Sequence, residues 1–479
     1  MEKFDLAVIG GGTGGLVTAA GASQFGAKVA LIEKDKLGGE CLYTGCVPSK
    51  TLLRSAKVAS LIRRASDFGI KVPSYEVDFS LVMARMRKVI EKVGEHDSPE
   101  RFRKLGVTVI HGEASFLSSD SLQVGDQRLK AKKFVIATGS RSTTPPVEGL
   151  PEAGFLTHVE ALNLTSPPKS LVVLGAGPIG LEFAQLFSRL GTKVTVLEVL
   201  GQILPREDTE VAQRLEEYLR AEGVEIYTCT RAFRVEVKNG QKIVHGSCEV
   251  VEPVKQPATF AAEEILVATG RAPNVEGLDL EKVGVEVNNK GIVIDAYLRT
   301  MAENIWACGD VTGKYPFTHV AEYQARLLVG NILFPFRRKA DYRVVPWTTF
   351  TDPELARVGL TEAEARKTYG DKIRVYRHSF ADVDRAEADG EPLGFVKVVC
   401  DPKGQIMGAH ILGPQAGDLL QPLVFAMKQR MPIGRISQTI HAYPTLVEAN
   451  RRAADQYYRE KLFSGWVGKF LRGWVRWLP

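Results

Sequence analysis

Two stretches of the chain, residues 4–33 and 170–198, repeat one order of apolar and polar positions. Each has a short apolar run, a glycine-rich turn, a longer segment with spaced apolar positions, and a second apolar run. The apolar runs predict buried strands, and the longer segments predict helices. We therefore expect two strand–turn–helix–strand stretches, the building block of a parallel sheet with helices on its faces.

In the first stretch, a strand at 4–9 leads into the turn, and a helix at Leu16–Phe25 and a strand ending at Glu33 follow. The turn carries three glycines in the spacing G-x-G-x-x-G, which are Gly10, Gly12 and Gly15. Such glycines allow close approach of a pyrophosphate, the helix N-terminus attracts its charge, and the acid binds ribose hydroxyls. This stretch predicts a dinucleotide site.

The second stretch has the same spacing at Gly175, Gly177 and Gly180, and Glu198 closes its second strand. Two such stretches predict two dinucleotides held together, FAD and a nicotinamide. An acid at the end of the second strand favours a free 2′-hydroxyl, and hence NAD(H) over NADP(H). Arg206 lies eight residues after that acid and keeps NADP(H) as the less favoured alternative.

Small polar residues follow three further apolar runs. The segments "VIATGS" and "LVATGR" end such runs in Thr-Gly, and we expect Thr138 and Gly139 to contact FAD and Gly270 to contact NAD. In "NIWACGDV", Asp310 follows a glycine at a strand end, where its carboxylate can bind the ribityl chain of a flavin. Gly-Asp by itself is also common in ordinary turns.

The stretch "GGECLYTGCVPSK" places Cys41 and Cys46 five positions apart. A metal site needs about four ligands, and neither a His nor a second Cys pair lies near them. Five residues of an ideal helix rise about 7.5 Å, whereas a disulfide needs its Cα atoms within about 7 Å. A bridge here therefore requires a distorted first helical turn, which Gly45 permits, and strain makes it easier to reduce. A helix N-terminus also stabilises a thiolate at Cys46. Because the pair follows the predicted FAD fold as well, we interpret it as a redox disulfide.

The composition is that of a globular protein of about three domains, with 479 residues, 44% hydrophobic and 25% charged. We expect neither a transmembrane helix nor a signal peptide, because no long apolar window exists and the first residues run straight into a strand. Six cysteines are too few for a secreted disulfide scaffold, which favours the cytoplasm. The net charge is +6, and outside the tail the basic and acidic side chains nearly balance. This argues against nucleic-acid binding. We expect four cysteines to be buried as small hydrophobes: Cys229, Cys248, Cys308 and Cys400.

The cysteine motif, both glycine spacings, "ATGR" and "CGD" together resemble the class I flavin disulfide reductases, from residue 4 to about 460. That family includes dihydrolipoyl dehydrogenase, glutathione reductase and mercuric reductase. The resemblance implies a homodimer that uses FAD and NAD(H). The implied fold is α/β, with two Rossmann-like dinucleotide-binding domains and an α+β C-terminal dimerisation domain. The implied divisions are 1–150 for FAD, 151–270 for NAD, 271–340 as a central region, 341–461 for the interface and 462–479 as a tail.

The resemblance also implies roles for single residues. Cys46 would face the flavin as the charge-transfer thiolate, and Cys41 would exchange with substrate. Lys50 and Glu182 match an ion pair of the family beside the flavin, and Gly39 and Lys50 match FAD contacts. Pro178 stands where some members place an aromatic gate over the flavin ring.

Family members that act on dithiols carry a His-Pro pair and, five residues after the His, a Glu. This chain reads "HAYPTLVEA", with Tyr443 at the position of the base, then Pro444 and Glu448. A tyrosine with a pKa near 10 is a poor base for a thiol, so we keep both His441 and Tyr443 as candidates for proton transfer. Mercuric reductase resembles the chain in having a Tyr here, but its C-terminal cysteine pair has no counterpart after Cys400, and its N-terminal metal-binding domain is not expected.

The expected activity is therefore electron transfer between NAD(H) and a dithiol or disulfide, like that of dihydrolipoyl dehydrogenase, with a lipoyl-carrying protein as partner. The alternatives are a metal-ion reductase like mercuric reductase and a membrane-associated flavoprotein electron donor. The membrane-associated alternative rests on the tail, where aromatic and aliphatic pairs recur every four residues with Lys469, Arg472 and Arg476 between them. This pattern predicts either docking to a membrane or partner, or packing on the protein's own surface or across the dimer.

Overall fold

The computed structural model describes residues 2–248, 255–463 and 465–477. The chain forms two compact units. The first unit comprises Met1–Lys169, Asn239–Lys242 and Glu263–Asp341, and the second comprises Ser170–Lys238, Ile243–Ala262 and Tyr342–Pro479. The five-part division expected from the sequence is finer than these units and stays a prediction.

The first unit is built on a seven-stranded sheet in the order β3-β2-β1-β6-β5-β4, with β18 also paired to β6. Its strands are β1 (Glu2–Ile9), β2 (Val29–Glu33), β3 (Val107–His111), β4 (Ala114–Ser118), β5 (Ser121–Val124), β6 (Gln127–Ile136) and β18 (Ile305–Ala307). Strands β3, β2, β1, β6 and β18 run parallel, whereas β4, β5 and β6 form an antiparallel meander. The sheet is therefore of the parallel, helix-covered kind that the apolar runs predict.

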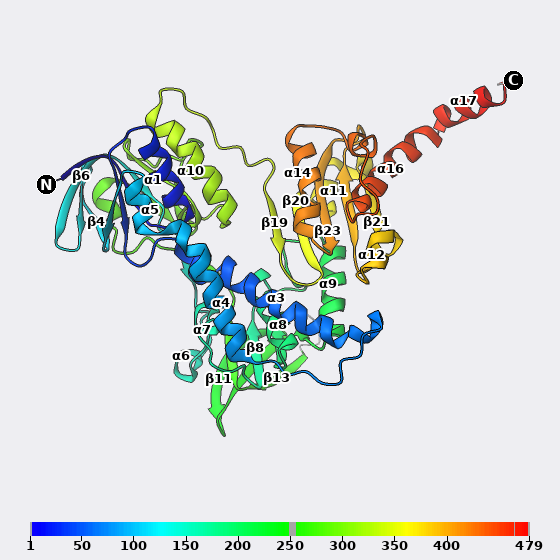
Figure 1. Cartoon of the computed structure of the whole chain (residues 1–479), viewed down its shortest axis with the longest axis horizontal. Coiled ribbons are helices and arrows are strands. Elements are labelled where there is room, and N and C mark those ends of the chain that lie inside the picture. Colours follow the sequence, from blue (N-terminus) through cyan, green and yellow to red (C-terminus); the bar gives the residue numbers. More distant parts are fainter. Residues whose placement is uncertain (1, 249–254, 464, 478–479) are drawn as a thin grey trace. The chain divides into compact units, whose positions relative to one another are not determined.

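Both faces of this sheet are buried, because neighbouring residues of β1 belong to different core clusters. Ala7 and Ile9 pack with Phe116 and Phe134 on one face. Leu6 and Val8 pack on the other face with α1 (Thr13–Gln24) and α10 (Thr318–Leu333), which lie side by side (Figure 1). Helix α1 starts at Thr13 rather than at the predicted Leu16, since the glycines after the turn already take helical conformation.

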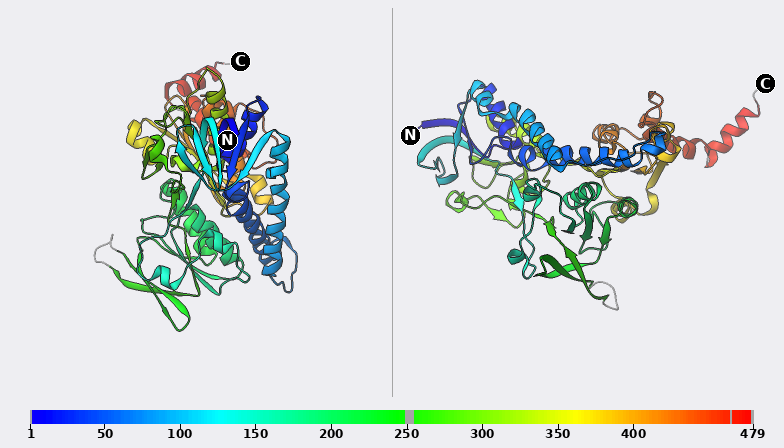
Figure 2. Two further views of the ribbon diagram at one scale, coloured as in Figure 1. Left: turned by 90° about the vertical axis from the view of Figure 1, so that its left-hand side faces the viewer. Right: turned by 60° about the horizontal axis from the view of Figure 1, so that its bottom comes forward.

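Most other helices of the first unit follow β2 and precede β3 along the chain. Among them, the long helices α3 and α4 pack side by side (Figure 2). The helices are α2 (Gly39–Tyr43), α3 (Cys46–Arg63), α4 (Phe79–Gly94), α5 (Pro99–Lys104), α6 (Leu150–Ala153) and α7 (His158–Ala161), with 3-10 turns η1 (Ala65–Phe68), η2 (Glu95–Asp97), η3 (Leu280–Val283) and η4 (Asp310–Thr312). The short strands are β7 (Ser140–Ser142), β14 (Glu264–Val267), β15 (Arg271–Pro273), β16 (Val287–Asn288) and β17 (Gly291–Ile292).

The second unit repeats the strand–turn–helix–strand pattern and adds an antiparallel sheet. Its first part contains β8 (Ser170–Leu174), α8 (Pro178–Arg189), β9 (Lys193–Leu197), α9 (Thr209–Ala221), β10 (Glu225–Tyr227), and the sheet of β11 (Arg231–Lys238), β12 (Gln241–Cys248) and β13 (Lys255–Ala262). Strands β8, β9 and β10 are parallel, as expected for a second dinucleotide fold.

The C-terminal part of the second unit is α+β. Its sheet has the order β19-β20-β23-β22-β21. These strands are β19 (Pro346–Thr349), β20 (Glu354–Gly359), β21 (Arg374–Ser379), β22 (Phe395–Cys400) and β23 (Ile406–Gly413). The helices are α11 (Glu362–Tyr369), α12 (Asp384–Ala388), α13 (Ala416–Leu419), α14 (Gln421–Lys428), α15 (Gly434–Ser437), α16 (Glu448–Phe463) and α17 (Gly465–Val475), with η5 (Gly370–Lys372) and η6 (Phe380–Asp382). In the described residues, no helix is long and apolar enough to cross a membrane.

Candidate redox active site

The end of β1 and the start of α1 form a cradle that only glycines permit. Gly10 has a φ of +107°, and a Cβ atom there would overlap the carbonyl of Ala137. A Cβ atom at Gly15 would overlap the carbonyl oxygen of Gly10. Gly12 is the N-cap of α1, and it gives the helix no side-chain cap. The N-cap thus offers the first N–H groups of α1 no side-chain acceptor, and a helix N-terminus of this kind suits a pyrophosphate, so these residues fit FAD.

Glu33 braces this turn from the end of β2. One carboxylate oxygen accepts the N–H of Gly11 at 2.5 Å, and the other accepts the N–H of Asp35 at 2.8 Å. The carboxylate is therefore fixed beside the glycine turn, where the predicted contact with ribose hydroxyls would take place.

The second glycine turn has the same construction. Gly175 has a φ of +101°, and Gly177 is the N-cap of α8, again without a side-chain cap. Glu198 is buried, and its oxygens accept the N–H groups of Ala176 at 2.8 Å and Leu200 at 2.9 Å. Arg206 lies over the ring of Trp347, 5.3 Å from its centroid. The turn therefore fits a dinucleotide, and the preference for NAD(H) over NADP(H) stays a prediction.

The cysteine-bearing loop packs directly on the first glycine turn. The N–H of Gly38 donates to the carbonyl of Gly11 at 2.8 Å. Gly39 has a φ of +63°, and a Cβ atom there would lie 2.7 Å from the Cα of Gly12. Only glycine allows this approach. It places the cysteine loop beside the cradle for FAD.

Cys41 and Cys46 lie on two helices that are separated at Thr44 and Gly45. Cys41 belongs to α2, and Cys46 is the first residue of α3, at the helix N-terminus that the sequence predicts. The expected distorted turn is thus a complete break, since Gly45 has φ −118° and ψ −113°, outside the helical region. Both residues are thiols in the structure rather than a disulfide.

The two thiols have different surroundings. A hydrogen bond with Cys46, together with burial, raises the pKa of the Cys41 thiol. Cys46 is an exposed residue, and its sulfur lies 3.6 Å from the hydroxyl of Thr318, at the start of α10. A position at a helix N-terminus favours a thiolate. Negative charge is therefore better placed on Cys46 than on Cys41.

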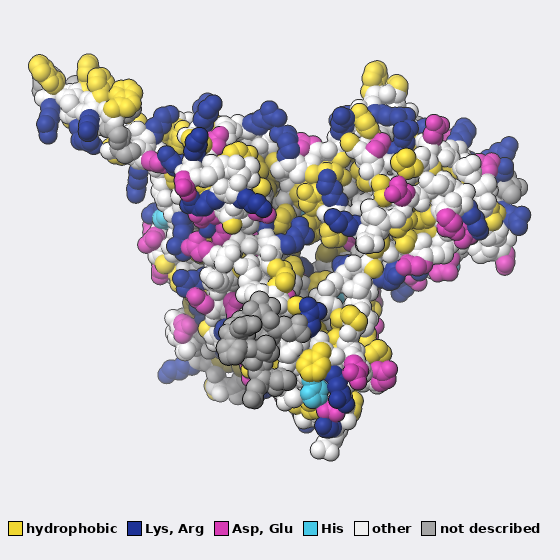
Figure 3. Space-filling model, turned by 180° about the vertical axis from the view of Figure 1, so that it is seen from behind, with side chains coloured by type: hydrophobic (Ala, Val, Ile, Leu, Met, Phe, Trp, Pro, Cys, Tyr) yellow, Lys and Arg dark blue, Asp and Glu magenta, His cyan; other side chains and the backbone are white. Residues whose placement is uncertain are grey.

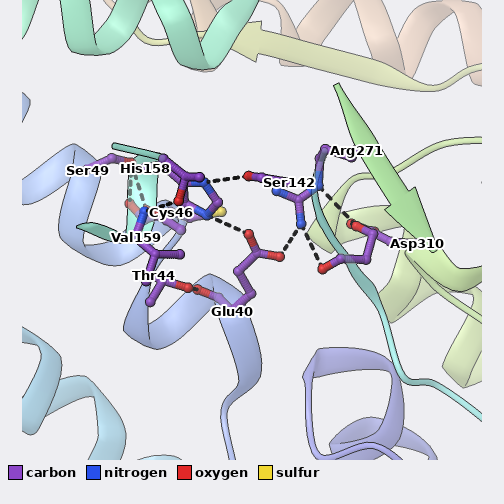
Figure 4. A network of polar contacts seen from close by, with 12 residues as sticks. Glu40, Thr44, Cys46, Ser49, Ser142, His158, Val159, Arg271 and Asp310 are labelled. Carbon is purple, nitrogen blue, oxygen red and sulfur yellow. Dashed lines mark hydrogen bonds and ion pairs between the residues drawn. The ribbon is translucent and has the colours of Figure 1, made fainter. Parts of the chain in front are cut away.

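A partly buried polar network holds α2 in place beside these cysteines (Figure 4). The Glu40 carboxylate accepts one hydrogen bond from Nε2 of His158 at 2.7 Å and another from the guanidinium of Arg271. His158 is buried, and its Nδ1 lies 3.1 Å from the hydroxyl of Ser142. Burial opposes ionisation of Glu40, but the bonds from His158 and Arg271 outweigh it and lower the pKa of this carboxyl.

The network continues to Asp310. Arg271 also donates to the hydroxyl of Ser140 at 3.0 Å, and Ser140 donates to the Asp310 carboxylate at 2.8 Å. Burial raises the pKa of Asp310, although the Ser140 hydrogen bond opposes this shift. The segments that follow the two Thr-Gly pairs thus meet, since β7 and β15 are antiparallel partners.

Replacing Glu40 with glutamine is expected to lower the free energy of unfolding of the first unit by about 2 kcal/mol at neutral pH, because Arg271 loses a charged acceptor. The folded-state pKa of Glu40 is depressed. Its stabilisation is therefore present above the unfolded pKa of about 4.3 and is lost as the pH falls through the folded pKa. In urea titrations, the difference in free energy of unfolding between the wild type and Glu40→Gln should shrink as the pH falls below about 4.3.

The control for this experiment is Glu276→Gln, which removes the exposed partner of Arg141. Exposed ion pairs contribute little, so this variant should unfold like the wild type. Equal losses in both variants would show that the network around Glu40 adds no special stability.

In the segment at the position of the family's His–Glu pair, Tyr443 and Glu448 have separate hydrogen-bond partners. Tyr443 is exposed, and its hydroxyl donates to Asp384 at 2.8 Å, which raises its pKa. Glu448 is buried and accepts from Arg451 at 2.8 Å, and its second oxygen has no hydrogen-bond partner in the described part of the chain. Nδ1 of His441 lies 2.9 Å from the carbonyl of Thr439. The Tyr443–Pro444 peptide is cis.

Other predicted residues have mixed surroundings. The Thr138 hydroxyl donates to the carbonyl of Asn274 at 2.6 Å, which gives it a structural bond. Gly139 faces open space, whereas a Cβ atom at Gly270 would lie only 3.0 Å from the hydroxyl oxygen of Thr143. Lys50 lies in the first unit and contacts Ser49, and Glu182 lies buried in the second and accepts the N–H of Phe350 at 2.9 Å. The Lys50–Glu182 ion pair therefore stays a prediction.

Of the remaining cysteines, two are buried and one is half-buried. Cys308 and Cys400 are buried as expected, but Cys229 is half-buried, at a positive φ of 51° on a turn after β10. The side chain of Cys248 lies outside the described part of the chain. Among the described residues, no group of three or more His, Cys, Asp and Glu side chains is placed to hold a metal ion.

Two family models match the chain in sequence. Residues 4–325 match pyridine nucleotide-disulphide oxidoreductase, and residues 345–454 match the dimerisation domain of the same family. The chain belongs to this family. Its members use FAD and NAD(P)H, and the dimerisation domain supports a homodimer, so the expected fold, cofactors and oligomer are confirmed at this level.

Relatives within the family have different names. The chain is 34% identical over 462 residues to a mercuric reductase of Streptomyces lividans, covering 95% of this chain and 96% of that one. It is 34% identical over 455 residues to a dihydrolipoyl dehydrogenase of Bacillus subtilis (strain 168), covering 94% and 97%. A solved Cu(II) complex of the HOCl-induced flavoprotein disulfide reductase RclA from Escherichia coli superposes with a TM-score of 0.84 at 30% identity, covering 95% of this chain and 100% of that one.

The residues around the cysteine pair were only partly visible in the sequence. Glu40 and Arg271 stand inside "GGECLYTGC" and "ATGR", so the motifs contained them without indicating that they pair. His158 and Thr318 have no motif of their own. They were missed because only the tertiary fold brings them to the cysteine loop.

Proposed function

We propose that this oxidoreductase uses NADH to reduce a thiophilic metal ion, such as Hg(II) or Cu(II), held by Cys41 and Cys46. The observation that carries the proposal is the hydrogen bond from Tyr443 to Asp384. Tyr443 stands at the position of the family base, and this bond joins it to an acid other than Glu448. The same bond raises the pKa of the phenol, so Tyr443 is a poor proton donor to a leaving thiolate.

The chemistry of the acceptor explains why this matters. Reducing a disulfide leaves a thiolate that must gain a proton, so the site benefits from a general acid. Reducing a metal ion needs no such group: NADH and Hg(II) give NAD⁺, H⁺ and metallic mercury, and two Cu(II) ions take one electron each to give Cu(I). Thiolates are also ligands preferred by soft metal ions. A mercuric reductase and a Cu(II)-complexed reductase are among the relatives.

Residues of this chain would carry defined parts of the reaction. FAD, when bound, supplies the means to accept a hydride from NADH and pass on the electron pair. The glycine turns at Gly12 and Gly177 would bind the two pyrophosphates. Cys46, exposed at the start of α3, would bind the ion as a thiolate, and Cys41 would lose its proton on becoming the second ligand.

A dihydrolipoyl dehydrogenase activity, with a lipoyl-carrying protein as partner, is the second candidate. One observation favours it. Because the Thr439 carbonyl can only accept, Nδ1 of His441 carries a hydrogen, and the neutral ring then has its lone pair on Nε2. That nitrogen would serve as a displaced base for a dithiol.

The test compares acceptors under anaerobic conditions. We expect wild-type protein to oxidise NADH with Hg(II) or Cu(II), and to reduce lipoamide at least about 100-fold more slowly. Tyr443→His should raise lipoamide turnover about tenfold or more, because the buried Glu448 oxygen without a partner is available to orient an imidazole. His441→Ala should leave metal reduction unchanged.

Rapid lipoamide turnover by the wild type that is lost in His441→Ala would contradict the metal proposal and establish the second candidate. Absence of NADH oxidation with every one of these acceptors, in protein that contains FAD, would contradict both.

A further inference from the structure

The last helix presents an apolar face that the chain does not cover. In α17, Trp466, Phe470 and Trp474 are 78%, 60% and 62% exposed, and Trp477 just beyond the helix is 88% exposed. A spacing of four residues places the first three on one side of the helix. Large aromatic side chains exposed together in this way mark an interaction surface.

The opposite side of α17 is cationic. Lys469 and Arg472 lie in the helix, Arg476 follows it, and no Asp or Glu occurs after Glu460 in the sequence. Figure 3 shows the two kinds of side chain on opposite edges of the projecting helix, hydrophobic along one edge and Lys or Arg along the other. Of the expected tail, residues 464, 478 and 479 lie outside the described part of the chain.

Two features argue against a purely structural role for this helix. Its apolar side chains are exposed rather than packed on the protein's own surface, which contradicts the self-packing alternative for the described residues of a single chain. It also lies beyond residue 454, where the match to the family's dimerisation domain ends.

The helix is too short to span a bilayer. Eleven residues rise about 16 Å, against a hydrocarbon core of about 30 Å. A short helix with aromatics on one face and cations on the other suits the interface instead, with rings at the depth of the acyl boundary and cations among lipid phosphates.

We propose that α17 docks the protein on membrane surfaces rich in anionic phospholipid. The surface lies outside the redox site and goes beyond the proposed function. The run of cations without any acid selects a negatively charged surface, and three tryptophans in the last fourteen residues match the interfacial preference of that side chain.

The test uses the full chain loaded with FAD and sedimentation with vesicles. We expect binding to phosphatidylcholine vesicles that contain phosphatidylglycerol, and little binding to pure phosphatidylcholine. The variant Trp466→Ala/Phe470→Ala/Trp474→Ala should bind at least tenfold more weakly. Charge reversal at Lys469, Arg472 and Arg476 should weaken binding by about 100-fold or more.

Matched controls separate the tail from general surface effects. Phe336→Ala removes an aromatic ring that is 84% exposed elsewhere. Reversal of three exposed lysines outside the tail, Lys88, Lys104 and Lys372, changes the net charge equally. Both controls should bind like the wild type, and every variant should keep NADH oxidation with an artificial acceptor, which separates this proposal from the redox one.

Three results would overturn the proposal. They are absence of binding to anionic vesicles, binding that survives both sets of tail substitutions, and dissociation of the dimer in the aromatic variant without any vesicle binding by the wild type. The last would identify a second copy of the chain as the occupant of this face.

Discussion

Cys46→Ser is expected to reduce NADH-dependent turnover of the acceptor at the cysteine pair by at least about 10³-fold. Cys46 is the exposed thiol at the N-terminus of α3, 3.6 Å from the Thr318 hydroxyl, and a serine there neither ionises at neutral pH nor binds a thiophilic ion. Steady-state NADH oxidation with Hg(II), Cu(II) and lipoamide measures the loss.

Two controls make the result specific. The bound FAD and its reduction by NADH should persist in Cys46→Ser, because the glycine turns are unchanged. Cys229→Ser replaces a half-buried thiol of the second unit and should keep full activity. If Cys46→Ser turned over acceptors at the wild-type rate, the cysteine pair would not lie on the path of the electrons.

Alanine at two equivalent glycines is expected to separate the two dinucleotide sites. A Cβ atom at Gly15 would overlap the carbonyl oxygen of Gly10, and one at Gly180 would overlap that of Gly175. Such overlap costs about 1–3 kcal/mol or more, since backbone must move. We expect Gly15→Ala to be purified largely without FAD. Gly180→Ala should keep FAD, but NADH should reduce the bound FAD far more slowly than in the wild type.

FAD content from absorbance and stopped-flow reduction by NADH measure the two effects. Gly330→Ala is the control, because a Cβ atom there meets nothing and its φ is ordinary, so both properties should be unchanged. Loss of FAD from both Gly15→Ala and Gly180→Ala would mean that the two turns do not serve separate dinucleotides.

Much of the fold was predictable because its signals are local. Apolar runs and glycine spacing located the two strand–turn–helix–strand stretches to within a few residues, and both are present as β1-α1-β2 and β8-α8-β9. The break between α2 and α3 was anticipated only as a distorted turn, since the sequence shows that Gly45 permits an unusual conformation but not which one the neighbours impose. The four-residue spacing of apolar pairs predicted a helix in the tail, but it did not predict that the aromatic side chains are exposed.

By itself, the sequence determined the chemistry that depends on neighbouring residues: the glycine turns, the cysteine pair, the acids that close the strands, and the Tyr at the position of the base. The tertiary structure alone decided which of these side chains meet. His158 and Arg271 reach Glu40 from 118 and 231 positions away, and Tyr443 reaches Asp384 from 59. Periodicity reports the face on which a residue lies, whereas a contact across such separations depends on how whole elements pack, and no local pattern encodes that.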